Sequence, residues 1–147
     1  MPNTPPNGTK EQSRSLAKVM TRSAFLHVQD ALAIDKLQIF IGHYQQGAGA
    51  SKTAQAYLDV DAARVVFGDL LLRAGLPEKL YPNNKMEFYG GSEKDGRIEA
   101  RVLRFREDTT KRNPIVVEVS TGPGKRTQQG GFAPAGELDT TGIYLDV

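Results

Sequence analysis

Apolar and polar residues alternate along several segments of the chain, and a period of two residues is typical of β-strands with one buried face. The alternation is clear over residues 36–46, where β-branched and aromatic residues also suit a pleated strand. Residues 52–60 repeat the pattern after a Gly- and Ala-rich segment at 47–51, so these two strands are predicted to form a hairpin. Further strands are predicted at residues 24–29, 86–89, 115–119 and 142–147.

Residues 62–74 instead show the spacing of an amphipathic helix. Their apolar stripe consists of Ala63, Val66, Phe67, Leu70, Leu71 and Ala74. Asp59 or Asp61 can cap the first turn, and Gly75 and Pro77 can end the helix. We therefore predict a helix over residues 62–74 that covers one face of a sheet.

The start of the chain has a different character. Residues 1–12 are rich in Pro, Asn and Gly and offer little to bury, which predicts a mobile tail. Leu16, Val19 and Met20 then fall at helical spacing, which predicts one or two helical turns after residue 13. A single folded domain is expected over residues 13–147.

Residues 97–106 read Arg-Ile-Glu-Ala-Arg-Val-Leu-Arg-Phe-Arg, and alternation holds until Val102 and Leu103, where two apolar residues adjoin. A β-bulge at this point would keep the apolar residues on the buried face and gather the arginines on the other. The buried set would be Ile98, Ala100, Val102 and Phe105, and the opposite set Arg97, Arg101, Arg104 and Arg106. Without the bulge, the arginines would divide between the two faces.

Glycine and proline residues predict several turns and strand ends in the second half of the chain. Residues 90–91 are predicted to close a strand, and residues 95–96 (Asp-Gly) are a strong turn signal. Turns are also predicted at residues 111–114 and 121–124, followed by a segment at 125–129 that pairs back and a loop at 130–136.

These elements predict an α+β fold. We expect an antiparallel, strongly curved sheet or a partly open β-barrel of about five to seven strands, with one main internal helix (62–74) closing one face or end. Pairing of exposed strand edges between copies would give a homo-oligomer.

Composition narrows the function classes. The 147 residues include no cysteine, which excludes disulfides, thiolate zinc sites and cysteine nucleophiles. The first residues lack the apolar stretch of a secretion signal, and no apolar run approaches the roughly 18 residues that span a bilayer, so we expect a cytoplasmic protein without a membrane partner. The net charge of +2 is small, but basic residues concentrate between Arg97 and Arg126.

No catalytic, metal or cofactor site is evident in the sequence. His27 and His43 have no partner at metal-ligand spacing. Residues 122–127 resemble a phosphate-binding loop but lack the glycine five positions before Gly124 and a Ser or Thr directly after Lys125. Carboxylate pairs such as Asp59 with Asp61 are explained by helix capping. We therefore expect a protein that binds without catalysis and without a cofactor.

What remains is a set of aromatic and basic residues on the strand faces opposite the apolar rows. Rings can stack on bases and cations can follow phosphates, so this set predicts a binding surface for single-stranded DNA or RNA, with DNA favoured. The predicted stacking residues are Phe40, Tyr44, Tyr57 and Tyr89, with Lys36 and Lys52 nearby. The predicted phosphate contacts are Arg101, Arg104, Arg106, Lys111 and Arg112, and a mobile turn with Lys125 and Arg126 would clamp the strand.

Three other interpretations stay open. Tyrosine and arginine are also enriched at protein interfaces, so the same face, or the loop at 130–136, could belong to a protein-binding module or regulatory subunit. In a closed barrel, Phe40 and Tyr57 could instead form a second core layer. An enzyme with an unusual carboxylate site would require a deep pocket around an acidic residue.

The order of strand hairpin, helix and strand hairpins, with arginines interleaved along a sheet, resembles small single-strand-binding β proteins of the Whirly-like or OB-fold class. The similarity is one of layout across residues 36–127, and it implies binding of single-stranded nucleic acid without assigning any site residue. Whirly-like proteins place their helix after four strands, and OB-folds place it after three.

Overall fold

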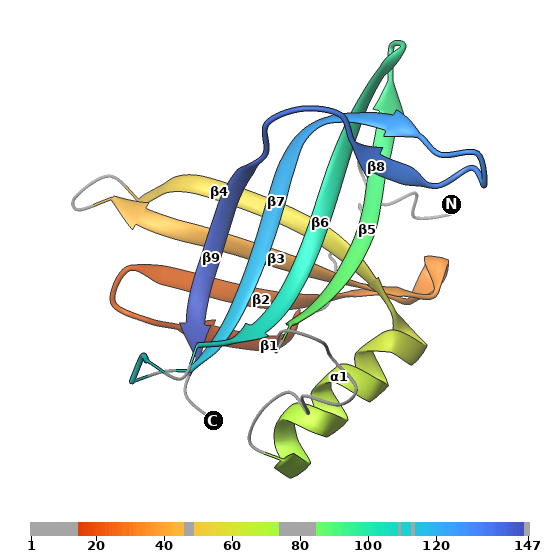
Figure 1. The fold of residues 1–147 in the computed structure, drawn as a ribbon. Helices are drawn as coiled ribbons and strands as arrows, with labels where there is room; N and C mark the ends of the chain where they lie inside the picture. Colours follow the sequence, from red (N-terminus) through yellow and green to blue (C-terminus); the bar gives the residue numbers. More distant parts are fainter. Residues whose placement is uncertain (1–14, 46–48, 74–84, 109, 113, 146–147) are drawn as a thin grey trace, which may run out of the picture.

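The computed structural model describes residues 15–45, 49–73, 85–108, 110–112 and 114–145. Within these residues, two antiparallel sheets cross one another, and a single helix lies beside their lower end (Figure 1). The predicted curved antiparallel architecture with one internal helix is confirmed, although the fold is mostly β and its nine described strands exceed the five to seven expected.

The first sheet, sheet A, contains four strands in chain order and precedes the helix. Its strands are β1 (Ser15–Met20), β2 (Ala24–Ala31), β3 (Lys36–Gln45) and β4 (Gly49–Asp59), with a short 3₁₀ turn, η1 (Leu32–Ile34), between β2 and β3. The helix α1 (Val60–Arg73) follows β4 directly. The predicted 36–60 hairpin and the 62–74 helix are therefore confirmed, and the helix begins two residues earlier than expected.

The second sheet, sheet B, is curled into a half-barrel. Its strands are β5 (Lys85–Lys94), β6 (Arg97–Glu107), β7 (Ile115–Arg126), β8 (Phe132–Pro134) and β9 (Asp139–Leu145). The first part of β7 pairs with β9, and its last residues pair with β8. Because β7 bends near this change of partner, β8 passes in front of the upper ends of β5 and β6 (Figure 1).

Glycines permit the tight curl of sheet B. A Cβ atom at Gly91 would lie 2.3 Å from the Glu99 carbonyl oxygen and 2.9 Å from the Phe132 ring. A Cβ at Gly124 would lie 2.8 Å from the Cβ of Ala100. Side chains at either glycine would push β8 and the end of β7 away from the strands they cover.

The hydrophobic core lies between the sheets. We call the sheet faces that meet there the core faces, and the opposite faces the outer faces. Fully buried core side chains come from both sheets and include Ile39, Ile41, Leu58, Leu103, Phe105, Val119 and Ile143. Helix α1 closes one end of this core, where Val66 is fully buried and the Phe67 ring meets Phe105 edge to face at 5.9 Å. Each such buried side chain contributes about 1.5–3 kcal/mol.

The first segment is a strand and not the predicted helical turn. β1 pairs antiparallel with β2 at the edge of sheet A, although Leu16, Val19 and Met20 remain exposed. Three apolar residues fit either period over so short a segment, and pairing with a neighbouring strand decided the outcome.

Three predicted interruptions in the second half are also wrong. Strand β5 continues through residues 90–91, β7 continues through residues 121–124 as far as Arg126, and β8 lies inside the predicted loop at 130–136. Glycine marks close approach between strands here and not the end of a strand. The turn at residues 95–96 is confirmed, with φ of 53° at Asp95 and 75° at Gly96.

The predicted tail at 1–12, the helix end at 75–77 and the first two residues of the predicted loop at 47–51 lie outside the described residues. Residues 49–51 belong to β4 and not to a loop, so this part of the loop prediction is wrong. No helix in the described ranges is long and apolar enough to cross a membrane.

Candidate functional site

Strand β6 runs through Val102 and Leu103 without a register shift against either neighbouring strand. The predicted β-bulge is absent, so side chains alternate along the whole strand. Arg101 shares the core face with Leu103, whereas Arg104 and Arg106 lie on the outer face. The prediction that these arginines share one face is therefore wrong, because continuous pairing on both sides enforces a period of two.

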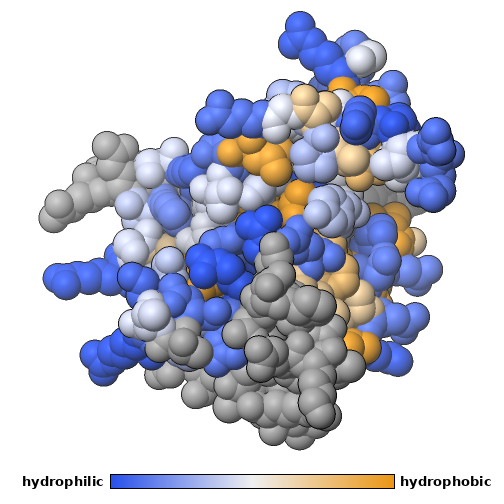
Figure 2. Space-filling view, in the orientation of Figure 1, coloured by the Kyte–Doolittle hydropathy of each residue, from blue (hydrophilic) through white to orange (hydrophobic). Residues whose placement is uncertain are grey.

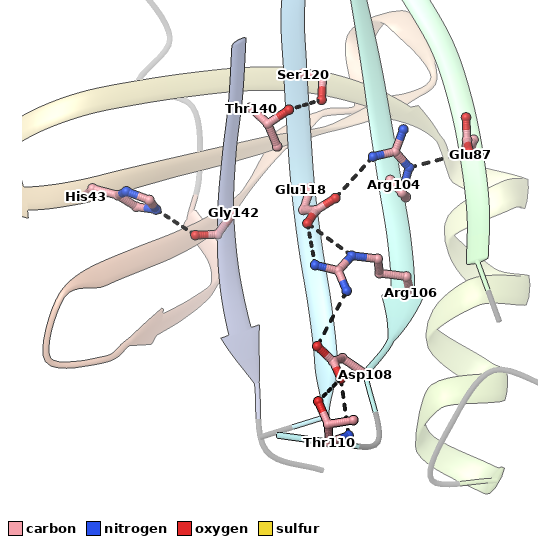
Figure 3. Close-up of polar contacts among 10 residues, drawn as sticks. All are labelled: His43, Glu87, Arg104, Arg106, Asp108, Thr110, Glu118, Ser120, Thr140 and Gly142. Atoms are coloured by element: carbon pink, nitrogen blue, oxygen red, sulfur yellow. Dashed lines mark hydrogen bonds and ion pairs between the residues drawn. The ribbon is translucent and has the colours of Figure 1, made fainter. Parts of the chain in front are cut away.

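Arg104 and Arg106 belong to an ion-pair network on the outer face of sheet B (Figure 3). Glu118 accepts hydrogen bonds from Arg104 Nη1 at 3.2 Å and from Arg106 Nε and Nη2 at 3.0 and 2.7 Å. Arg104 Nε also lies 3.4 Å from Glu87 Oε1, and Arg106 Nη1 lies 3.9 Å from Asp108 Oδ2. Two guanidinium groups thus face three carboxylates, which leaves little positive charge for phosphates.

The ion pairs between these arginines and carboxylates are electrostatically favourable. The hydrogen bond to Glu118 raises the pKa of Arg106 above its ordinary value. Side-chain exposure is low for Glu118, at 13%, so the pairs are shielded from water and from salt. Figure 2 shows that the surrounding outer face is largely hydrophilic, with scattered apolar residues. A phosphate would have to displace a carboxylate here.

A second group of predicted site residues lies where the edge of β4 approaches the edge of β5. A groove of about 630 Å³ opens between these strands, and we call it the β4–β5 groove. Its charged and exposed aromatic lining residues are Lys36, Asp59, Glu87, Arg101, Tyr57 and Tyr89, and the Phe132 ring also lines it. The structure therefore brings together three of the predicted site residues, Tyr57, Tyr89 and Arg101, from two different sheets.

The two tyrosines are the exposed walls of the groove. Tyr57 projects from the outer face of sheet A with 40% exposure, and Tyr89 from the outer face of sheet B with 60% exposure. The Tyr89 hydroxyl donates to Glu87 Oε2 at 2.8 Å, and this hydrogen bond raises the pKa of Tyr89. The bond fixes the hydroxyl of Tyr89, and its exposed ring can contact a ligand.

Arg101 is the cation at the centre of this region. Its Nε donates to Glu99 at 3.0 Å and its Nη2 to Ser92 Oγ at 3.0 Å. The residue also borders two neighbouring hollows, one of which reaches Phe40 on sheet A. These bonds hold the guanidinium in one orientation at the point where the three hollows meet. Lys36, on the opposite side of the groove, is paired with Asp59.

No cluster of three or more metal-ligating side chains occurs in the described ranges. No protein-family model, curated protein or solved structure matches the chain. The groove thus combines two exposed tyrosine rings with the cations Lys36 and Arg101 and the carboxylates of Asp59 and Glu87.

Phe40 and Tyr44 lie elsewhere, in a ring cluster on the outer face of sheet A. Phe25 is its centre, with ring centroids 5.7 Å from Phe40, 5.3 Å from Tyr44 and 4.9 Å from His27. The Phe25 ring lies over Gly42, where a Cβ would come within 2.2 Å of it. Phe25 is buried in this cluster and Phe40 is half-buried, as in the second core layer considered for Phe40, whereas Tyr44 remains 37% exposed.

The remaining predicted contacts are dispersed. Lys111 and Arg112 lie in the connection from β6 to β7, at the other end of sheet B from Lys125 and Arg126. Within the described residues, Lys111, Arg112 and Lys125 form no salt bridge, whereas Arg126 is paired with Glu93 at 3.0 Å. These four residues do not form a single cluster.

The sequence interpretation missed Phe132. It was assigned to a loop, yet its ring packs against Gly91 and lines the β4–β5 groove. A lone aromatic residue within a segment of Gly, Ala and Pro was the available signal, since such a ring is seldom left without a packing role.

Proposed function

We propose that this protein binds single-stranded nucleic acid, with DNA favoured, in the β4–β5 groove and without catalysis. One observation carries the proposal: exposed tyrosines from two sheets, Tyr57 and Tyr89, flank a groove that also contains the fixed guanidinium of Arg101.

The binding chemistry follows from these groups. Bases stack on Tyr57 and Tyr89, and each stacked base contributes about 1–3 kcal/mol with little dependence on sequence. Arg101 contacts the phosphate between them, and Lys36 supports a neighbouring phosphate while remaining close to Asp59. Arg104 and Arg106 act as structural ion-pair residues in this proposal, because they bind Glu118 on the outer face of sheet B and do not line the groove.

The order of elements also supports the proposal. Four antiparallel strands precede α1, which is the position of the helix in the Whirly-like class that the sequence layout resembles. The support is limited to layout, since folds host many functions.

The direct test is fluorescence anisotropy with labelled single-stranded oligonucleotides at several salt concentrations. We expect binding that weakens as salt rises, with a slope of about −0.7 in log K against log salt for each phosphate contacted. Absence of binding to both DNA and RNA at low salt would contradict the proposal.

Gly90 provides a variant that blocks the groove without disturbing the fold. It borders the groove, and a Cβ at this position meets no atom within 4 Å. G90V should therefore retain the melting temperature of the wild type but bind oligonucleotides more weakly. G68A is a matched glycine control on α1, outside the groove.

The same groove supports a second candidate function, binding of an extended peptide. Among the described strands, β4 pairs only with β3, and β5 pairs only with β6. Both strands therefore present unpaired backbone groups to the groove, which is the requirement for strand addition. A protein-binding module of this kind would ignore oligonucleotides, and its binding to an extended peptide would not weaken steeply with salt.

A further inference from the structure

We infer that Arg126 is a positioning residue for Phe132, which is a third stacking surface of the β4–β5 groove, and that Arg126 is not a phosphate contact. This inference rests on the proposed function of that groove. It replaces the predicted role of Arg126 as part of a mobile clamp.

Phe132 needs an anchor because β8 is short. Within the described residues, the three residues of β8 pair with Gly124, Lys125 and Arg126 at the end of β7, and the Ala135 N–H donates to the Pro123 carbonyl at 2.8 Å beside them. The Phe132 ring nevertheless occupies a defined position on the wall of the groove. It fills the space beside Gly91 that a larger side chain would take. Three ladder pairs alone hold a strand weakly.

Arg126 supplies that anchor through three contacts. Its guanidinium carbon lies 4.5 Å from the centre of the Phe132 ring, within the range of a cation–π contact. Its Nε and Nη2 donate to Glu93 Oε2 on β5 at 3.2 and 3.0 Å, and its Nη1 donates to the Gly130 carbonyl at 3.2 Å. The guanidinium thus ties β8 and the preceding turn to the edge of β5.

The turn between β7 and β8 is fixed on the other side as well. Thr127 and Gly131 exchange backbone and side-chain hydrogen bonds of 3.0 Å, and Gly130 adopts φ of 82°. With the turn closed in this way, the Arg126 contacts decide where the Phe132 ring rests. The donors of Arg126 that point to Glu93 and Gly130 are already used, so a phosphate would have to displace them.

The chain offers a charge-matched control. Lys125 is the neighbouring residue and carries the same charge, but it is exposed and forms no salt bridge in the described part of the chain. R126A and K125A therefore remove one positive charge each from the same strand end. Only R126A removes the contact with Phe132.

Three oligonucleotide measurements separate positioning from phosphate contact. F132A should weaken binding by about tenfold, within the range expected for one lost stacking contact. R126A should weaken it similarly with an unchanged salt slope, and the double variant R126A/F132A should be no weaker than F132A alone. A phosphate contact would instead make the two effects additive and reduce the slope by about 0.7, which would overturn the inference.

Substitution of Glu93 should change oligonucleotide affinity in opposite directions for the two possible roles of Arg126. Removing a carboxylate beside a phosphate path should strengthen binding if Arg126 served the phosphates. If Arg126 positions Phe132, E93A should weaken binding, and E93Q, which retains an acceptor oxygen, should weaken it less. Stronger binding by E93A would contradict the inference.

An NMR measurement on the protein alone separates this inference from the proposed function. Nuclear Overhauser contacts between the Phe132 ring and Gly91 should be present in the wild type and in K125A, and should be lost or weakened in R126A. If they persist in R126A, the positioning role is wrong. If they are lost but no variant or wild type binds an oligonucleotide, the positioning role stands and the nucleic-acid function fails.

Discussion

Arg101 and Arg104 lie three positions apart on β6, and their side chains point to opposite faces of sheet B. Arg101 borders the β4–β5 groove, whereas Arg104 is enclosed between Glu87 and Glu118 on the outer face. Both guanidinium groups are paired with carboxylates, Arg101 with Glu99 and Arg104 with Glu87 and Glu118, but of the two only Arg101 lines the groove.

This difference predicts that R101A and R104A, which each remove one positive charge, affect oligonucleotide binding unequally. R101A should weaken oligonucleotide binding by about tenfold and reduce the salt slope by about 0.7, because it removes one phosphate contact. R104A should change affinity by less than about twofold, since that guanidinium lies on the outer face of sheet B and does not line the groove. Anisotropy titrations at three salt concentrations measure both effects. Equal losses in the two variants would contradict this assignment.

Glu118 should contribute to stability more than an exposed ion-pair residue does. E118Q removes the charge shared by Arg104 and Arg106 in a partly buried site, and we expect the free energy of unfolding to fall by about 1–3 kcal/mol. D139N breaks an exposed pair with Lys52 and should cost less than about 1 kcal/mol. Urea denaturation compares the two. A smaller loss in E118Q than in D139N would show that the network is not stabilising.

Gly42 and Gly68 should respond in opposite directions to alanine. A Cβ at Gly42 would come within 2.2 Å of the Phe25 ring, so G42A should destabilise the fold by about 1–3 kcal/mol. A Cβ at Gly68 meets no atom within 4 Å outside its own helix, so G68A should stabilise the fold by about 0.5–1 kcal/mol. Thermal melting followed by circular dichroism shows both shifts. A neutral G42A would mean that the Phe25 ring moves aside without cost.

His27 should make stability depend on mild acidity. Burial, followed by the nearby charge of Lys18, lowers the pKa of His27 below its ordinary value of 6.5. The unfolded chain therefore binds this proton more readily than the folded chain, so the contribution of neutral His27 is complete above pH 6.5 and is lost as pH falls towards the folded pKa.

Denaturant unfolding at pH 5 and pH 7.5 tests this dependence. H27Q should reduce the difference between the two pH values, and K18Q should reduce it partially, because the charge of Lys18 is the smaller of the two causes. An H27Q variant with the full wild-type difference would assign the dependence to another group.

The pattern of apolar and polar residues was sufficient to predict the strands, helix and turn that depend on residues close together in the sequence. The alternation over β3 and β4 and the stripe of α1 reflect which side of each element is buried, and the Asp95–Gly96 turn requires the left-handed conformations that these residues tolerate. These features were predictable because the physical cause lies within about fifteen residues of chain.

Tertiary structure decided the features that depend on distant partners. The face occupied by Arg101 is fixed by unbroken pairing of β6 with two neighbouring strands, and β1 is a strand because β2 pairs with it. The β4–β5 groove exists because two sheets cross so that their edges meet, and Phe132 reaches it because β7 bends over β5. The sequence by itself determined which segments are strands or helix over most of the domain. It could not determine which side chains share a surface, because that depends on strand register and on contacts between residues far apart in the chain.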